Sequence, residues 1–203
     1  RVMGHEIMNT ITPIVSLSET LSTRTVEYSQ MRQGMQVIHK RSKGLMEFVE
    51  NYRKITRIPT PVKENVCLND LLNGISNLFP DDFIHFTAPS DTIYVKIDRT
   101  QIEQVLINLI KNAIDACAGR DNPCIGIKAS SGDKGAATIE ISDNGPGILP
   151  DVLDKIFIPF FTTKENGSGI GLSLCKRIMH LHNGNITVES TSEKGTRFTL
   201  KIS

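Results

Sequence analysis

Two prolines in residues 58–62 (IPTPV) constrain the fold of this chain more than any other feature. Proline has no backbone N–H and its ring clashes with the preceding turn, so a helix cannot continue through this stretch. The spacing of apolar residues also changes there, from a helical period before it to short alternating runs after it. We therefore predict an α+β fold in two domains, a helical hairpin over residues 1–57 and an α/β domain over residues 58–203.

The residues before the prolines predict two packed helices. The second segment carries an apolar stripe at heptad spacing, with Ser42 in one slot: Met31, Met35, Ile38, Leu45, Val49 and Tyr52. The first segment carries a similar stripe: Ile7, Ile11, Ile14 and Leu21. Residues 22–30 are polar and are the predicted connection. Because two helices alone bury such stripes poorly, we predict a homodimeric four-helix bundle.

Composition limits the classes of partner. The formal net charge of +1, with acids and bases interspersed, gives no reason to expect nucleic acid as the main partner. No apolar run reaches the roughly 18 residues that span a bilayer, so we expect a cytoplasmic chain, with membrane attachment of a longer parent left open. The chain starts inside a helical pattern without Met, so we expect an upstream sensor region to be absent from it.

The cysteines show no CxxC spacing and lie in apolar or helical contexts: Cys67, Cys117, Cys124 and Cys175. We expect buried, reduced thiols in preference to a metal site or a disulfide.

The second domain predicts helices alternating with short strands. The expected helices are residues 68–79, 99–118 and 171–181, and the middle one starts with a capping box from Asp98 to Gln101. The expected strands are residues 83–88, 92–97, 125–130 and 137–142, followed by a closing hairpin around Gly195. This pattern predicts a mixed sheet packed against helices.

The helix at residues 99–118 carries a polar stripe. Asn108 and Asn112 lie four residues apart and Asp115 lies three further on, so the three share one face. A solvated helix face explains this pattern by itself. Alternatively, the amide and carboxylate oxygens on this face bind an Mg²⁺ ion that also binds phosphate groups.

Two glycine-containing motifs follow. A predicted strand ends at Asp143 and runs into Gly145 and Gly147. This sequence is typical of a plain turn. Alternatively, the glycines allow a ligand to approach closely, and Asp143 accepts a hydrogen bond from its exocyclic amine. Further along, residues 167–171 (GSGIG) precede a helix, and glycines there expose backbone N–H groups to phosphate. The second motif fits neither a P-loop nor a dinucleotide fingerprint.

These motifs occur in a fixed order, with FIPFFTTK at residues 157–164 between them and Gly195-Thr196 after them. That order strongly resembles the ATP-binding domain of sensor histidine kinases, of the superfamily shared with gyrase and MutL. The resemblance covers residues 60–203 and implies a sandwich of a mixed sheet and three helices. Asp115-Ala116 replaces the common Lys-Tyr and resembles the nitrogen-regulation type, and Ile158 stands where glutamate is often found.

The resemblance implies ATP and Mg²⁺ as cofactors, with Asn112 as the metal ligand, Asp143 on the adenine amine, and a short lid over residues 157–168. The implied nucleotide-binding residues are Asn108, Lys111, Asn112, Asp115, Asp143, Gly145, Gly147, Ile148, Phe160, Thr163, Lys164, Gly167, Ser168, Gly169, Ile170, Gly171, Leu172 and Thr196.

The first helix carries the predicted reactive residue. On a helical wheel His5 lies about 160° from the apolar stripe, so it faces water, and Asn9 lies on the same side. An ordinary exposed histidine explains this placement as well. The motif HEIMN resembles the phosphoacceptor box of histidine kinases, which implies that His5 is phosphorylated, Glu6 is its base, and Asn9 acts in dephosphorylation. Pro13 removes a helix bond to the carbonyl of residue 9, and we expect a kink there.

The sequence therefore predicts a protein-histidine kinase that autophosphorylates His5 from ATP. It would then transfer the phosphoryl group to an Asp of a response-regulator receiver domain, and would act as a phosphatase on that regulator. Two alternatives stay open: an ATPase of the same superfamily, which would need a water-activating glutamate at the position of Asn108, and a binding module that holds ATP without chemistry.

Overall fold

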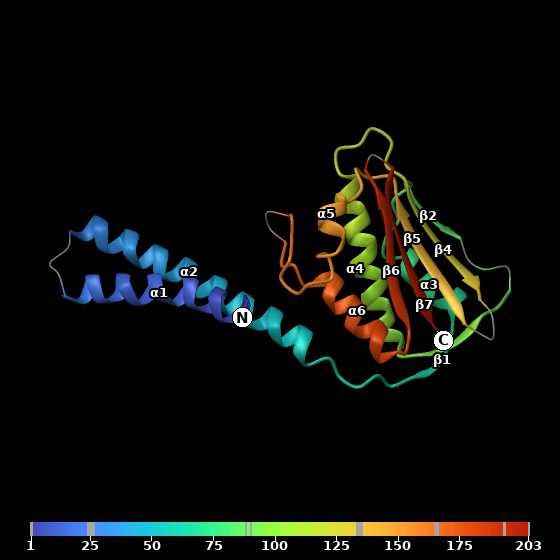
Figure 1. Ribbon diagram of the computed structural model, residues 1–203, viewed down its shortest axis with the longest axis horizontal. Coiled ribbons are helices and arrows are strands. Elements are labelled where there is room, and N and C mark those ends of the chain that lie inside the picture. Colours follow the sequence, from blue (N-terminus) through green and yellow to red (C-terminus); the bar gives the residue numbers. More distant parts are fainter. Residues whose placement is uncertain are drawn as a thin grey trace. The chain divides into compact units, whose positions relative to one another are not determined.

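The computed structural model of the protein describes residues 2–23, 27–87, 89, 91–132, 136–164, 167–192 and 194–202. Side chains are described from residue 7 onwards, apart from those of residues 22 and 23. The chain separates into two compact units, Arg1–Arg57 and Ile58–Ser203, each of which is visible in Figure 1.

The first unit is a pair of helices, α1 (Val2–Thr23) and α2 (Tyr28–Thr56), which pack along each other (Figure 1). Both helices extend into the predicted polar connection, which leaves Glu27 as the N-cap of α2 and residues 24–26 outside the described part of the chain. Gly34 is buried on α2, and a Cβ at this position would lie 2.9 Å from a methyl of Leu21. The missing side chain therefore lets the helices approach closely.

The predicted heptad stripe stays partly uncovered within this single chain. Met31, Met35 and Val49 are 43%, 58% and 44% exposed. An apolar stripe of this length is normally buried between helices, so the exposure leaves room for further helical partners.

The second unit is built on a five-stranded sheet with the order β2-β4-β5-β7-β6. Its strands are β2 (Ile84–Thr87), β4 (Ile125–Ser131), β5 (Ala137–Asp143), β6 (Asn185–Thr191) and β7 (Gly195–Ile202). β2 runs parallel to β4, and the other pairs are antiparallel, so the predicted mixed sheet is confirmed. A separate pair, β1 (Glu64–Cys67) and β3 (Tyr94–Ile97), includes one strand, β1, that the sequence pattern did not predict.

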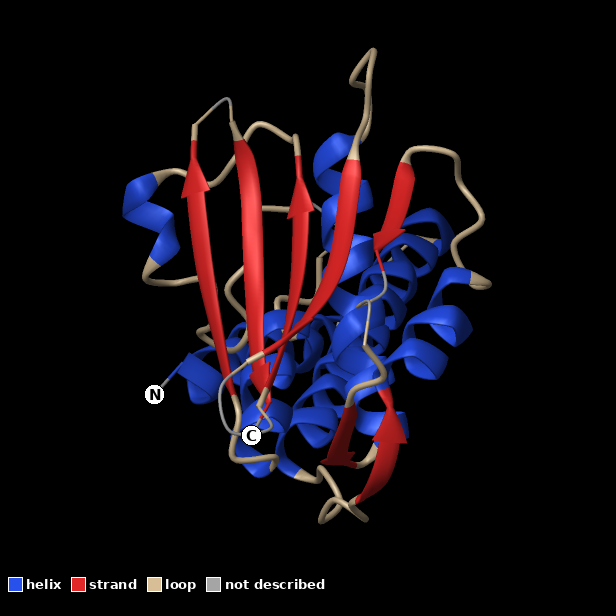
Figure 2. Cartoon of the chain, turned by 90° about the vertical axis from the view of Figure 1, so that its right-hand side faces the viewer, coloured by secondary structure: helices blue, strands red, loops and turns tan. Residues whose placement is uncertain are grey.

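Helices cover one face of the sheet, as Figure 2 shows with the open face toward the viewer. α4 (Arg99–Cys117) packs on β5 and β4, α6 (Gly171–Leu181) packs on α4 and β6, and α3 (Leu68–Ser76) packs on α4. A fourth, short helix, α5 (Pro150–Leu153), was not predicted. Strand residues alternate accordingly: Ile139 and Ile141 of β5 are buried under the helices, and Glu140 and Ser142 point to the open face. The predicted α+β fold class is confirmed.

The N-terminus of α4 ties several segments together. The Asp98 carboxylate accepts from the Gln101 N–H at 3.1 Å, as a cap should. The predicted capping box is only half formed, because the Gln101 side chain donates to the carbonyl of Pro59 at 3.0 Å instead of reaching back. The Asp98 N–H donates to Nε2 of the buried His182 at 3.0 Å. His182 therefore takes the role that Gln101 was expected to play, while the Gln101 side chain binds Pro59.

The four cysteines are free thiols, as predicted, but not all of them are buried. Cys117 and Cys175 are buried, and burial raises the pKa of Cys175 to about 12. Cys124 is exposed and Cys67 is half-buried, because each flanks a strand end instead of facing the core. Among the described helices, none is both long and apolar enough to cross a membrane.

Candidate functional site

A pocket of about 730 Å³ lies in the second unit between α4, the start of α6, the end of β5, the start of β7, and the described residues of the segment that joins β5 to α6 and contains α5. Of the predicted nucleotide-binding residues, those lining it are Asn108, Lys111, Asn112, Asp115, Asp143, Gly147, Ile148, Thr163, Lys164, Gly167, Ser168, Gly169, Gly171, Leu172 and Thr196. The three motifs far apart in sequence therefore meet around one cavity.

Asp143 ends β5 at the inner end of this pocket. Its Oδ1 accepts from the N–H groups of Gly145 at 2.8 Å and Thr196 at 3.3 Å. Burial raises the pKa of this carboxyl, and the two backbone donors and the charge of Arg120 lower it only in part. Both donors use the same oxygen, which leaves Oδ2 as the side of the carboxylate that a ligand amine can reach.

Two glycines shape the backbone beside Asp143. Gly147 has a φ of +77°, and a Cβ there would collide with the carbonyl of Thr191 on β6. At Gly145 a Cβ would lie 2.7 Å from Asp143 Oδ1. A side chain at either position would displace the pocket wall, so the glycines are needed for close approach and not only for a turn.

Ser190 joins three parts of the pocket wall and was missed by the sequence reasoning. Its hydroxyl accepts from the N–H of Ile148 at 2.8 Å, donates to the carbonyl of Gly195 at 3.0 Å, and lies 3.0 Å from the hydroxyl of Thr196. A serine in a strand has no motif around it. Only the pairing of β6 with β7, which sets Ser190 opposite Thr196, places it here.

The loop over the pocket is closed at its base. The N–H of Phe160 donates to the carbonyl of Gly169 at 2.8 Å, and both residues have positive φ, +66° and +67°. A Cβ at Gly169 would lie 2.5 Å from the carbonyl carbon of Phe160, which is a steric clash, so only glycine fits this position. Residues 160–169 thus form a pinched loop, of which residues 165 and 166 are outside the described part.

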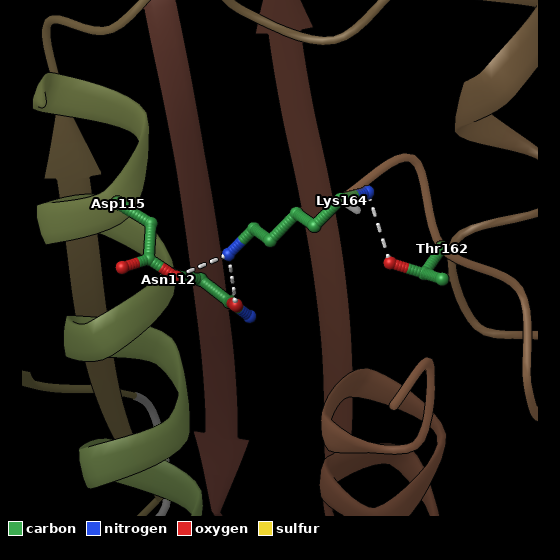
Figure 3. Close-up of polar contacts among 4 residues, drawn as sticks. All are labelled: Asn112, Asp115, Thr162 and Lys164. Atoms are coloured by element: carbon green, nitrogen blue, oxygen red, sulfur yellow. Dashed lines mark hydrogen bonds and ion pairs between the residues drawn. The ribbon is translucent and has the colours of Figure 1, made fainter. Parts of the chain in front are cut away.

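Lys164 extends from this loop to α4, as Figure 3 shows. Its Nζ donates to Asn112 Oδ1 at 3.2 Å and to Asp115 Oδ2 at 2.6 Å. The backbone N–H of Lys164 is held by the Thr162 hydroxyl at 3.1 Å. The predicted polar stripe of α4 is therefore not merely solvated, because two of its oxygens converge on one positive charge.

The start of α6 faces the same cavity. Gly171 and Leu172 line the pocket, and nothing lies within 4 Å of a Cβ built on Gly171. The N–H groups of a first helical turn have no partner within the helix, and the helix dipole there favours an anion.

Three of the predicted nucleotide-binding residues do not line the cavity. Gly145 lies behind Asp143, Phe160 lies at the base of the loop, and Ile170 is buried as the N-cap residue of α6. Six lining residues were not in the predicted set: Ala116, Val152, Ile156, Phe161, Thr162 and Phe198. All of these except Thr162 are apolar or aromatic, and only their place in the fold distinguishes them from core residues.

The predicted reactive residues lie in the first unit. His5 and Glu6 are within α1, and their side chains are outside the described part of the structure. Asn9 is exposed. α1 continues through Pro13 as a single helix, and the kink expected there stays a prediction.

Proteins similar to this chain include nucleotide-binding families. Residues 97–203 match the family described as "Histidine kinase-, DNA gyrase B-, and HSP90-like ATPase". The sensor histidine kinase ZraS of Salmonella typhimurium is 32% identical over 204 residues, which is 98% of this chain and 43% of ZraS. The chain thus spans less than half the length of that relative.

Two solved structures are similar in fold. The catalytic domain of histidine kinase ThkA is 34% identical with a TM-score of 0.61, and covers 69% of this chain and 94% of that one. The complex of ThkA with the response regulator protein TrrA is 28% identical to this chain with a TM-score of 0.66, over 98% of this chain and 59% of ThkA. The motif resemblance to sensor histidine kinases is therefore confirmed, and the chain belongs to the family of histidine kinase-, DNA gyrase B-, and HSP90-like ATPases.

Proposed function

We propose that this chain is the kinase core of a two-component system, a protein-histidine kinase that transfers the γ-phosphoryl group of ATP to His5 and from there to an Asp of a response regulator. One observation carries the proposal: an acceptor carboxylate, a cation-binding pair of oxygens and an open helix N-terminus surround a single pocket of about 730 Å³. The parts suit a base, a metal–phosphate group and an anion respectively.

The α4 oxygens fit a magnesium ion. Asn112 Oδ1 and Asp115 Oδ2 both contact the Lys164 ammonium, so a positive charge is already accommodated between them. Both are hard oxygen donors, the type that Mg²⁺ prefers. Asn112 would hold the ion together with phosphate oxygens, and the ion would neutralise charge that develops on the transferred group.

The remaining pocket residues would bind and orient the nucleotide. Asp143 Oδ2 would accept from the amine of the base, and the first turn of α6 would hold phosphate oxygens through its N–H groups. When the metal occupies Asn112, Lys164 would turn from α4 to a phosphate. The pinched loop would exclude water, which protects the phosphoryl group from hydrolysis.

The chemical step would occur at His5. An imidazole nitrogen forms a bond to the γ-phosphorus as the bond from that phosphorus to the β–γ bridging oxygen breaks, and ADP leaves. Glu6 would take the proton from the imidazole, which makes it the general base. In the second step a carboxylate oxygen of the regulator's Asp attacks the phosphorus and the P–N bond to His5 breaks.

The first unit would supply the dimer and the docking surface. The exposed stripe residues of α1 and α2 fit a second copy of the hairpin, which completes a four-helix bundle. The ThkA structure contains a response regulator, and that supports a receiver domain as the partner of this chain. Asn9 is exposed and one turn from His5, which suits a role in orienting water when the regulator is dephosphorylated.

Labelled ATP tests the proposal. The chain should acquire a label that is lost in acid and kept in base, and His5→Gln should abolish it. His39→Gln, at an exposed position on α2, is the matched control and should keep the label. Steady phosphate release without a label would favour an ATPase. ATP binding with neither label nor release would favour a binding module.

A further inference from the structure

Asp143, Thr196 and Ser190 form a row across three strands at one end of the sheet. Thr196 on β7 pairs with Asp143 on β5 and with Ser190 on β6. All three lie on the helix-covered side, as the burial alternation of their strands requires. Asp143 and Thr196 line the pocket, and Ser190 contacts both Thr196 and the loop residue Ile148 from behind.

Counting protons decides how this row is polarised. A serine hydroxyl has one proton to donate and two lone pairs to accept with. The carbonyl of Gly195 can only accept, so the Ser190 proton is directed to it across 3.0 Å. The Ser190 oxygen then accepts twice, from the N–H of Ile148 at 2.8 Å and from the hydroxyl of Thr196 at 3.0 Å.

The hydroxyl proton of Thr196 is thereby used on Ser190. What Thr196 presents to the pocket is an oxygen with lone pairs only, and the neighbouring Asp143 carboxylate also offers only lone pairs when ionised. The wall formed by these two residues accepts hydrogen bonds and donates none from its side chains.

We propose that Ser190 is a positioning residue that sets the base preference of the pocket. By holding the Thr196 hydroxyl as an acceptor, it makes the wall suitable for a purine with a 6-amino group and unsuitable for one with a 6-oxo group. An oxo oxygen at this wall would face lone pairs on both sides, with no donor to meet it. The inference rests on the proposed ATP site and adds a residue that does not itself touch the nucleotide.

A purely structural role for Ser190 predicts a different outcome. If its hydrogen bond to Ile148 only held the loop, removing the hydroxyl would weaken every purine nucleotide by the same factor. If Ser190 also directs the Thr196 proton, its removal frees that proton to turn toward the pocket. Thr196 could then donate to a 6-oxo group, and the preference between bases would change.

The test compares ATP with inosine triphosphate, which differs at the 6-position, by titration calorimetry with Mg²⁺. The unsubstituted chain should bind ATP more tightly. In Ser190→Ala the dissociation constant for inosine triphosphate divided by that for ATP should fall by about five-fold, the size expected of one redirected hydrogen bond. Ser142→Ala is the matched control, because Ser142 lies on the open face and its hydroxyl donates to the Gly126 carbonyl; it should leave the ratio unchanged.

Additional variants keep the test decisive. Ser190→Thr retains the hydroxyl and should restore the ratio. Ser190→Cys, a weaker hydrogen-bonding group of similar size, should give an intermediate ratio and serves if the alanine variant does not fold. In Thr196→Val, a further Ser190→Ala change should no longer alter the ratio. A ratio in Ser190→Ala equal to that of the unsubstituted chain overturns the inference, whereas failure of the unsubstituted chain to bind ATP overturns the proposed function instead.

Discussion

Replacing Asp143 by Asn should separate nucleotide affinity from stability. Oδ1 of Asp143 holds two backbone donors, from Gly145 and Thr196. An asparagine would keep its carbonyl oxygen on those donors, because its amide group would otherwise point N–H at N–H. The NH₂ group would then occupy the place of Oδ2, where the amine of the base is proposed to bind.

The expected loss of affinity follows from that geometry. A hydrogen bond to a charged acceptor contributes about 1.5–3 kcal/mol, and here it is replaced by two facing donors. The dissociation constant for ATP should therefore rise by roughly 10- to 150-fold. Inosine triphosphate, whose 6-oxo group can accept from the new NH₂, should lose less or gain.

Stability should move the other way. Burial raises the pKa of Asp143, so ionising it costs more in the folded chain than in the unfolded one. The stabilising contribution of this group is fully present below its unfolded pKa of about 4 and is lost as pH rises through the higher folded value. The Asn variant avoids that loss, so at pH 7 its unfolding temperature should equal or exceed that of the unsubstituted chain, with the difference shrinking toward pH 4.

Two measurements decide the matter: calorimetric titration with MgATP, and thermal unfolding followed by circular dichroism between pH 4 and 8. Glu140→Gln is the control, because Glu140 lies on the same strand but on the open face. If Asp143→Asn binds ATP like the unsubstituted chain, Asp143 is not the base acceptor. If it instead lowers the unfolding temperature by several degrees at pH 7, the carboxylate is a structural cap and the reasoning from its raised pKa is wrong.

Three further substitutions test other parts of the site. Lys164→Met removes an exposed ion pair worth about 0–1 kcal/mol, so the unfolding temperature should hardly change, but ATP affinity should fall several-fold. Lys155→Met, at an exposed position shortly after α5, is the matched control and should change neither. Gly147→Ala forces a residue with a Cβ to a φ of +77° against the Thr191 carbonyl, and denaturant unfolding should show a loss of roughly 1–3 kcal/mol, whereas Gly171→Ala, in open space at a helix start, should not be destabilising. Pro13→Ala restores an N–H to the middle of α1 and should raise its helicity and alter the balance of autophosphorylation and phosphatase rates; three unchanged rates would remove Pro13 from the mechanism.

Most elements could be predicted because their signals are local. α6 spans the predicted residues 171–181 without change, and α4 differs from its prediction by one residue. The spacing of apolar residues and the residues at the helix ends determine the bounds of such helices from their own sequence. β1 and α5 were missed because Glu64–Cys67 shows no apolar alternation and Pro150–Leu153 is only one helical turn; β1 forms a ladder through its pairing with β3.

Pocket residues also divide into those with a local sequence signal and those placed by strand pairing. Asp143, Asn112 and Gly169 carry motif signals and line the cavity. Ser190 and Phe198 reach the site only through strand pairing, and no spacing rule relates β6 to the loop at Ile148. Pocket residues that carry a motif were therefore predictable, and those that reach the pocket only through strand pairing required the tertiary structure.

The proline stretch that separates the two domains in sequence is not a free linker over its whole length. The Gln101 side chain holds the carbonyl of Pro59 at 3.0 Å, and the Asp98 carboxylate accepts from the N–H of Val62 at 3.0 Å. Gln101 is buried, so breaking its bond would leave a polar group unpaired inside the second unit, at a cost of about 1–3 kcal/mol. These two hydrogen bonds therefore hold Pro59 and Val62 to the start of α4 within the second unit, in agreement with the division of the chain after Arg57.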